Sequence, residues 1–152
     1  MKQSRDKVIR RIEFVFYNES RIREAVTEER ADPTPRHSIL SVREGKKDPT
    51  LQIVLRELSP LPRVKFGNHE LERPEEWLEV IEQTYSRAEG IERELGKSRY
   101  RRKETYQKFC IRKRISKSEY YRILEKFRVK AIVETARKYL IETGNTIEIK
   151  TK

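Results

Sequence analysis

The sequence predicts an all-α protein: an N-terminal helical region followed by a C-terminal helix-turn-helix whose second helix is long. Apolar residues recur at intervals of three and four in several segments, which is the period of a helix. A capping pattern at Ser116 marks the start of the last helix. We expect residues 1–70 to form a helix and a proline-rich arm, residues 71–142 a helix-turn-helix domain, and residues 143–152 a tail.

Two helices and a long arm are expected in the first part of the chain. Mostly helical spacing of apolar residues predicts a helix over residues 5–30, with a break at residues 18–20. Three prolines and a glycine in residues 31–50 indicate a loop or an extended arm. A short helix is expected over residues 50–58. It ends before two further prolines, because proline cannot donate a backbone hydrogen bond and restricts the residue before it.

The middle of the chain predicts one well-marked helix over residues 71–88. Pro74 suits a first helical turn, and the two glutamates after it lie where the positive end of the helix dipole favours carboxylates. An apolar stripe at helical spacing follows, which is typical of a core-facing helix surface. Its members are Trp77, Leu78, Ile81, Tyr85 and Ala88. Gly90 and Gly96 are expected to interrupt the chain on either side of residues 91–95.

The net positive charge of the chain lies entirely in its C-terminal part. Residues 91–152 contain 19 Lys/Arg and 8 Asp/Glu, whereas residues 1–90 contain 17 of each. The excess is concentrated in residues 97–130, where 14 Lys/Arg accompany 3 Glu. A local basic segment with aromatic residues spaced through it is typical of a nucleic-acid-binding element. A solvated helix face is the alternative explanation of such a charge run.

Two short-range patterns in the basic part predict a helix-turn-helix. Tyr106, Phe109 and Cys110 form a short apolar helical face, followed by three basic residues. Ser116 and Glu119 then form a capping box, in which each side chain bonds the backbone amide of the other, and this places the start of a second helix. Two short helices joined by a tight turn, the second strongly basic, make a helix-turn-helix. The inward face of the second helix is expected to carry Tyr120, Leu124, Phe127 and Ala131, flanked by Ile123.

The exposed face of the second helix is where base contacts are expected, because the first turns of this helix enter the major groove in such motifs. The expected base-contacting residues are Lys117, Ser118, Tyr121 and Arg122. Other basic residues are expected to contact phosphates, which gives affinity and register rather than sequence choice. These are Arg101, Arg102, Lys103, Arg112, Lys113, Arg114 and Lys126. For each residue taken alone, plain solubility is the competing explanation.

A family signature occurs at the start of the second helix. Phage transcriptional regulators of the RinA/ArpU type carry the pattern I-S-x-[ST]-x-Y-Y-R, and this chain resembles them in Ile115-Ser116-x-Ser118-x-Tyr120-Tyr121-Arg122. Their helix-turn-helix is similar to the promoter-reading fourth region of sigma factors. Residues 45–50 and 75–82 match the family loosely. The resemblance implies a sequence-specific regulator of late or packaging genes that binds double-stranded DNA, and direct contact with RNA polymerase is left open.

Lys113 departs from the pattern, which usually has an aliphatic residue two positions before Ile115. Either the lysine stem lies along the core with its amine in water, or Ile111 takes the packing role through a shifted turn. The expected phosphate contact of Lys113 depends on which alternative holds.

The helix that begins at Ser116 is expected to continue to about residue 142 with its apolar face switched. At roughly 100° per residue, the stripe that begins at Val129 lies about 180° from the first stripe. Its partner is the Trp77 helix, the N-terminal helix or a second copy of the chain. A subunit or interdomain contact is favoured, because the aliphatic residues would otherwise be exposed. The candidate interface residues are Val129, Ile132, Val133, Ala136 and Leu140.

The composition argues against several classes of protein. A single cysteine allows no internal disulfide, and the two histidines lie far apart, so neither a metal nor a cofactor is expected. No apolar run approaches the roughly 20 residues that cross a bilayer, and no signal peptide is visible, so a cytoplasmic protein without a membrane partner is expected. The absence of a catalytic carboxylate pair or a phosphate-binding glycine loop argues against an enzyme. The alternative function is a small terminase-like DNA-packaging subunit that works as a ring.

Overall fold

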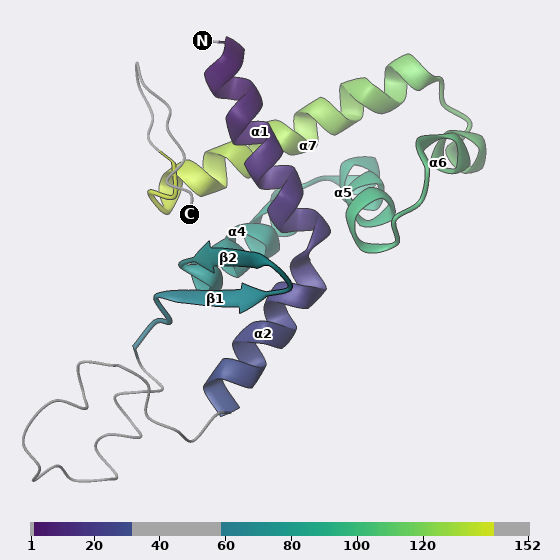
Figure 1. The fold of residues 1–152 in the computed structure, drawn as a ribbon. Helices are drawn as coiled ribbons and strands as arrows, with labels where there is room; N and C mark the ends of the chain where they lie inside the picture. Colours follow the sequence, from purple (N-terminus) through teal and green to yellow (C-terminus); the bar gives the residue numbers. More distant parts are fainter. Residues whose placement is uncertain (1, 32–58, 142–152) are drawn as a thin grey trace, which may run out of the picture.

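The computed structural model describes residues 2–31 and 59–141, and this part of the chain is mostly helical with one small two-stranded sheet (Figure 1). The all-α class predicted from the sequence is confirmed. The helices are α1 (Lys2–Tyr17), α2 (Glu19–Ala31), α4 (Pro74–Arg87), α5 (Gly90–Gly96), the π-helical turn η2 (Lys97–Arg101), α6 (Tyr106–Lys113) and α7 (Lys117–Arg137), and the strands are β1 (Arg63–Phe66) and β2 (His69–Glu72). The expected arm, the short helix over residues 50–58 and the tail lie outside the described residues.

The N-terminal helical region divides at Asn18, where the sequence predicts a break. The backbone amide of Asn18 donates to the carbonyl of Phe14 at 3.1 Å, and the side-chain amide donates to the same oxygen at 2.8 Å. α2 begins at the next residue, Glu19, whose carboxylate accepts from Arg23 one turn later at 3.1 Å. The predicted break is confirmed.

A β-hairpin that the sequence analysis did not anticipate precedes α4. β1 pairs antiparallel with β2, with Val64 opposite Leu71. Gly67 has a φ of +61° in the turn, a conformation that glycine adopts at no steric cost. Leu71 is fully buried as a strand residue, and the helix expected to begin there begins at Pro74. The expected start is wrong because hydrogen bonds to β1 hold this segment extended.

The centre of the fold is α7, which α1 crosses and against which α4 and α5 pack (Figure 1). The buried ring of Phe127 meets rings from three other elements. Its ring centroid lies 5.8 Å from Phe16 of α1, 5.3 Å from Tyr85 of α4 and 5.8 Å from Tyr100 of η2. One side chain of α7 therefore joins the N-terminal, middle and C-terminal parts of the described chain.

One continuous core runs through the described residues, from Val8 in α1 to Ile141 after α7. The domain boundary expected at residue 70 falls inside β2. Leu71 of this strand belongs to the same core as Trp77 of α4 and the apolar face of α1. The boundary therefore does not separate two cores in the described part of the chain.

A single buried stripe runs along α7, in place of the opposite faces expected for its two halves. The stripe of the first half continues through Ala131 to Glu134 and Thr135, all of them buried. The Glu134 carboxylate pairs with Arg87 of α4 at 2.6 Å. The Thr135 hydroxyl donates to the carbonyl of Ala131 at 2.9 Å. The predicted face switch is wrong because polar residues with partners, rather than apolar ones, complete the buried stripe.

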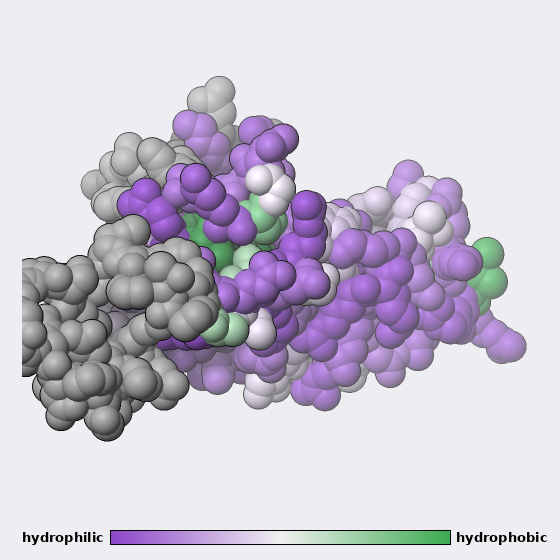
Figure 2. Space-filling model, turned by 60° about the horizontal axis from the view of Figure 1, so that its bottom comes forward, coloured by the Kyte–Doolittle hydropathy of each residue, from purple (hydrophilic) through white to green (hydrophobic). Residues whose placement is uncertain are grey.

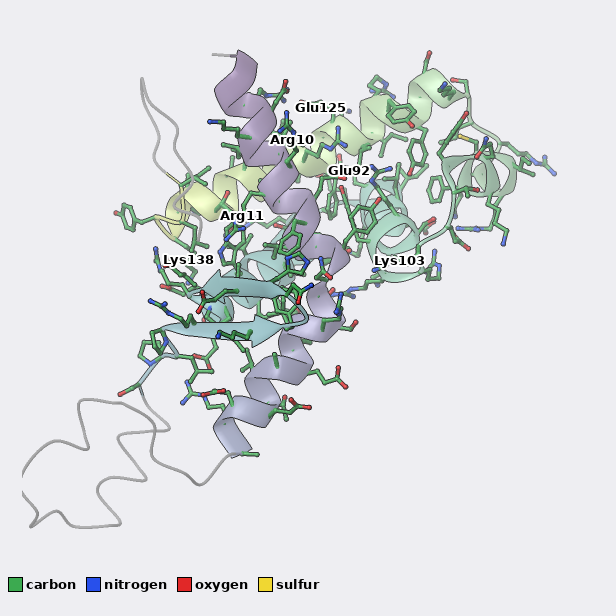
Figure 3. The ribbon with its side chains drawn as sticks, in the orientation of Figure 1. Arg10, Arg11, Glu92, Lys103, Glu125 and Lys138 are labelled. Carbon is green, nitrogen blue, oxygen red and sulfur yellow. The ribbon has the colours of Figure 1, made fainter. Side chains whose placement is uncertain are left out.

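The C-terminal end of α7 lies at Arg137, earlier than the expected end near residue 142. The chain leaves helical geometry at Tyr139, whose φ is +57°. Arg73, just before α4, donates to the carbonyls of Lys138 and Tyr139 at 2.6 and 2.9 Å. A cation at the negative end of the helix dipole thus satisfies carbonyls that have no helical partner (Lys138 is labelled in Figure 3).

The substitution Gly96→Ala is expected to destabilise the fold. A Cβ atom at this position would lie 2.5 and 2.7 Å from two ring atoms of Phe127 and 3.0 Å from Tyr85. Both rings are packed against other buried rings and cannot move aside freely. The free energy of unfolding, measured by urea titration, is expected to fall by about 1–3 kcal/mol.

The matched control for Gly96→Ala is Gln83→Ala, at an exposed position of α4. Its unfolding free energy is expected to stay within about 0.5 kcal/mol of the wild-type value. Equal stability of Gly96→Ala and the wild type would contradict the packing around Phe127.

Candidate nucleic-acid interface

The segment expected to form a helix-turn-helix consists of α6, a turn over residues 114–116 and α7. Arg114 has a φ of +57° and ends α6. The amide of Ile115 donates back to the carbonyl of Cys110 at 3.0 Å, and the amide of Arg114 donates to the carbonyl of Ile111 at 3.3 Å. This pair of bonds around a left-handed residue is a Schellman helix end, which reverses the chain tightly.

Ser116 caps the N-terminus of α7, as the sequence predicts. Its hydroxyl accepts from the amide of Glu119 at 3.0 Å. The Glu119 carboxylate accepts from Arg122 instead of completing the capping box, and this hydrogen bond holds the pKa of Glu119 below its usual value. The predicted helix start is confirmed. The two-way cap is wrong, because a guanidinium one turn further along competes for the carboxylate.

An aromatic contact joins α6 to α7. Phe109 of α6 is fully buried, and its ring centroid lies 5.8 Å from that of the buried Tyr120. Thr105 caps α6 by accepting from the amide of Lys108 at 3.3 Å. The short first helix therefore has a defined start and a fully buried aromatic contact with the second helix.

Lys113 is partly exposed, and its ammonium is paired within the fold. Its side chain is 33% exposed, and its ammonium pairs with Glu94 of α5. The hydrogen bond from Lys113 lowers the pKa of Glu94. Ile111 is 77% exposed, so it does not take the packing role. Of the two alternatives left open by the sequence, the packing of Ile111 is wrong, and the amine of Lys113 is held by a carboxylate rather than by water alone.

The four residues expected to contact bases are all polar or aromatic side chains on the first two turns of α7. Three are exposed with the charged or hydroxyl group at the surface, and Tyr121 is 41% exposed. The ammonium of Lys117 lies 5.3 Å from the ring centre of Tyr106 in α6. The end of the molecule that carries α6 is covered mainly by hydrophilic residues (Figure 2). The exposed set is Lys117, Ser118, Tyr121 and Arg122.

The residues expected to contact phosphates divide into two groups, of which the first has acceptors inside the protein. Lys103 donates to the carbonyls of Tyr17 and Tyr100 at 2.6 and 2.8 Å, next to the junction of α1 and α2 (Figure 3). Arg101 pairs with Glu19 of α2 at 3.0 Å. These two cations join η2 and the residues just after it to the N-terminal helices, so they help to hold the fold.

Glu104 forms ion pairs with two more of the residues that were expected to contact phosphates. Its carboxylate lies 3.7 Å from Arg102 and 3.1 Å from Arg112, and it accepts from the Ser98 hydroxyl at 2.6 Å. Hydrogen bonds from Ser98 and Arg112 lower the pKa of Glu104 to about 2. The carboxylate is therefore charged at neutral pH and offsets part of the local positive charge.

The second group makes no ion pair within the part of the chain that the structure describes. Arg114 in the turn and Lys126 on α7 are exposed, and neither side chain makes an ion pair with a described residue. Lys108, on the surface of α6, is also exposed without an ion pair to a described residue. It was not among the phosphate-contacting residues expected from the sequence. Its outward position follows from the burial of its neighbour Phe109. We call Lys108, Arg114 and Lys126 the unpaired basic set.

The residues expected to form a subunit interface do not share one surface. Leu140 is buried beyond the end of α7, and Ile132 and Ala136 pack against the core. Val129 and Val133 are 45% and 42% exposed. Most of the proposed interface is therefore already covered within one chain, because α7 keeps the same face buried along its length.

A charged cluster beneath α1 was not anticipated. Glu13 of α1 accepts from Arg99 at 3.1 Å and from Arg128 of α7 at 3.0 Å, and the Tyr100 hydroxyl donates to the same carboxylate. Burial acts to raise the pKa of Glu13, but hydrogen bonding from Tyr100 and the charge of Arg99 outweigh it, so the pKa lies below its usual value. Its members come from three distant segments, and no local motif could have predicted the cluster.

Two kinds of site are missing from the described residues. Their His, Cys, Asp and Glu side chains form no group of three or more that could hold a metal ion. None of the described helices is both long and apolar enough to cross a membrane. Comparisons of the chain with protein-family models, with curated proteins and with solved structures found no match.

The substitution Glu13→Gln is expected to destabilise the protein and to change how its stability depends on pH. Two arginines would lose their common carboxylate, so the free energy of unfolding is expected to fall by about 2 kcal/mol at neutral pH. The lowered pKa of Glu13 contributes stability that is present above its unfolded pKa and is lost as pH falls through the folded pKa. Urea titrations from neutral pH to below pH 4.5 should therefore show a shallower loss of stability in the variant than in the wild type.

Glu125→Gln is the matched control, because Glu125 also joins α7 to α1, through Arg5, but in an exposed pair (Figure 3). Exposed pairs contribute little to stability, so this variant should unfold like the wild type. A pH dependence of Glu13→Gln identical to that of the wild type would show that Glu13 is not the titrating group.

Proposed function

We propose that this protein is a sequence-specific DNA-binding transcriptional regulator of phage or prophage genes, and that α6 and α7 form its helix-turn-helix. The observation that carries the proposal is the exposed start of α7. Its first two turns present Lys117, Tyr121 and Arg122 to solvent, between Arg114 in the turn and Lys126. A guanidinium in that position can bind the O6 and N7 atoms of guanine in a major groove.

The attachment of α7 supports this role. Its middle is fixed by Phe127 and by Arg128, which pairs with Glu13 at 3.0 Å. The N-terminal part extends past the crossing with α1 toward α6 (Figure 1). A helix that is anchored in the middle and exposed at its N-terminal end can enter a groove without losing packing. The Schellman turn at Arg114 and the cap at Ser116 fix where the exposed part begins.

The unpaired basic set supplies the non-specific part of the proposed binding. Lys108, Arg114 and Lys126 make no ion pair with a described residue that DNA would have to break, so they can neutralise phosphates and release counterions at little cost. Arg122 differs, because it pairs with Glu119. That pair is exposed and holds the guanidinium weakly, so a guanine can compete for it.

The assignment of roles is tested with Arg122→Ala and Lys126→Ala. A preferred sequence is first selected by the wild-type protein from a pool of random duplexes, and binding is then measured by fluorescence anisotropy over a range of salt concentrations. Arg122→Ala is expected to weaken the preferred duplex about 5- to 150-fold and to lose most of the preference over random duplex. Lys126→Ala is expected to weaken both duplexes alike and to reduce the salt slope by about one.

Lys65→Ala is the control, because Lys65 is an exposed cation on β1, outside the proposed motif. It should bind both duplexes like the wild type. The proposal fails if the selection yields no preferred duplex, or if all three variants lose affinity equally.

A further inference from the structure

An aromatic cluster lies at the flank of the proposed DNA-reading face. The rings of Tyr106 in α6 and of Tyr120 and Tyr121 in α7 contact one another pairwise, with centroid distances of 5.9 Å for Tyr106 and Tyr120, 5.9 Å for Tyr106 and Tyr121, and 5.1 Å for Tyr120 and Tyr121. Tyr120 is buried beneath the other two. Lys117 adds a cation 5.3 Å from the ring centre of Tyr106.

Only one of these rings, Tyr120, is fully buried. Tyr120 contacts the buried Phe109 and belongs to the core, whereas Tyr121 is 41% exposed and Tyr106 is half-buried. Both outer rings rest on Tyr120, which holds their orientation. The result is a pair of supported aromatic rings with an ammonium beside them, open to solvent.

This combination matches the chemistry of an unpaired nucleobase. An exposed aromatic ring offers a flat apolar surface on which the face of a base can stack, and a neighbouring lysine can hold the phosphate of the same nucleotide. In an intact duplex the faces of the bases are covered by their neighbours, so only a base outside the stack can use such a ring. Binding of a phosphate without its base would require only the cation and no aromatic ring.

The position on α7 places the cluster beside the proposed reading face. Tyr121 and Arg122 are consecutive residues, so their side chains leave the helix about 100° apart. When Arg122 faces a groove, Tyr121 lies at the edge of the contact. A base that leaves the stack at that edge would meet the ring.

We propose that Tyr106, Tyr121 and Lys117 form a stacking site for an unpaired base, so that this protein binds DNA with a locally opened strand more tightly than fully paired DNA. This inference rests on the proposed function for the duplex contact, but the stacking site itself requires only the aromatic cluster. The base stacks on the exposed face of Tyr121, and Lys117 contacts its phosphate.

The test compares three labelled probes by fluorescence anisotropy: a matched duplex, the same duplex with a central run of thymine mismatches, and oligothymidylate. The wild type is expected to bind the mismatched duplex more tightly than the matched one. Tyr121→Ala should abolish that difference and weaken oligothymidylate binding roughly 5- to 150-fold. Tyr121→Phe should behave like the wild type, because the ring and not the hydroxyl is used.

Tyr139→Ala is the matched control, since Tyr139 is 84% exposed and lies beyond the end of α7. It should leave binding of all three probes unchanged. The inference is overturned if the wild type binds matched and mismatched duplexes equally or binds none of the probes, if Tyr121→Ala keeps the difference, or if Tyr121→Phe loses it.

Failure of the proposed function gives a different result. In that case the matched duplex is not bound and Arg122→Ala has no effect, while oligothymidylate binding still depends on Tyr121. If Arg122→Ala weakens the matched duplex but Tyr121→Ala has no effect on the mismatched one, the proposed function stands and the stacking site is wrong.

Discussion

The packing of Phe127 is the constraint on which the rest of the fold depends. Rings from α1, α4 and η2 meet it, and Gly96 of α5 approaches so closely that a side chain there would overlap the ring. Because large rings bury much area and prefer tilted contacts, the directions of these elements relative to α7 are set together. The cluster around Glu13 adds directional hydrogen bonds between α1, η2 and α7. The middle of α7 is thereby held from several sides, which leaves its N-terminal turns at the surface.

The position of α6 depends on contacts of another kind. Phe109 is its only fully buried residue. Tyr106 adds ring contacts to Tyr120 and Tyr121, and Lys113 adds an ion pair with Glu94. A helix held by one fully buried ring, one half-buried ring and exposed or half-exposed ion pairs is fixed less firmly than the helices around Phe127. The tight turn at Arg114 compensates in part, because its two backbone bonds leave the chain few alternative paths. The position of α6 relative to α7 therefore depends on the backbone structure of the turn more than on burial of side chains.

Features with a local cause could be predicted from the sequence, and features with a tertiary cause could not. The cap at Ser116 and the first-turn position of Pro74 follow from backbone hydrogen bonding within a few residues. The hairpin also has a local signal, since Gly67 and the asparagine after it separate two short alternating segments, but this signal was missed in favour of a longer helix. The face of α7 was mispredicted because Glu134 and Thr135 are buried through partners that the sequence does not reveal.

The pairing of charged residues is a further feature that the sequence alone could not predict. It also determines where an anionic partner can bind. Because residues 1–90 have no net charge, the sequence suggests that they do not affect the basic residues of the C-terminal part. Two carboxylates from that part, on Glu13 and Glu19, are nevertheless the acceptors of Arg99, Arg101 and Arg128. These helices cover the middle of α7 and η2, and the cations there form ion pairs within the fold. The cations that make no ion pair with a described residue include Arg114, in the turn between α6 and α7, and Lys126, in the first half of α7, so they lie toward the N-terminal end of α7. The surface potential of this end is thus set by the placement of the acids as much as by the number of lysines and arginines.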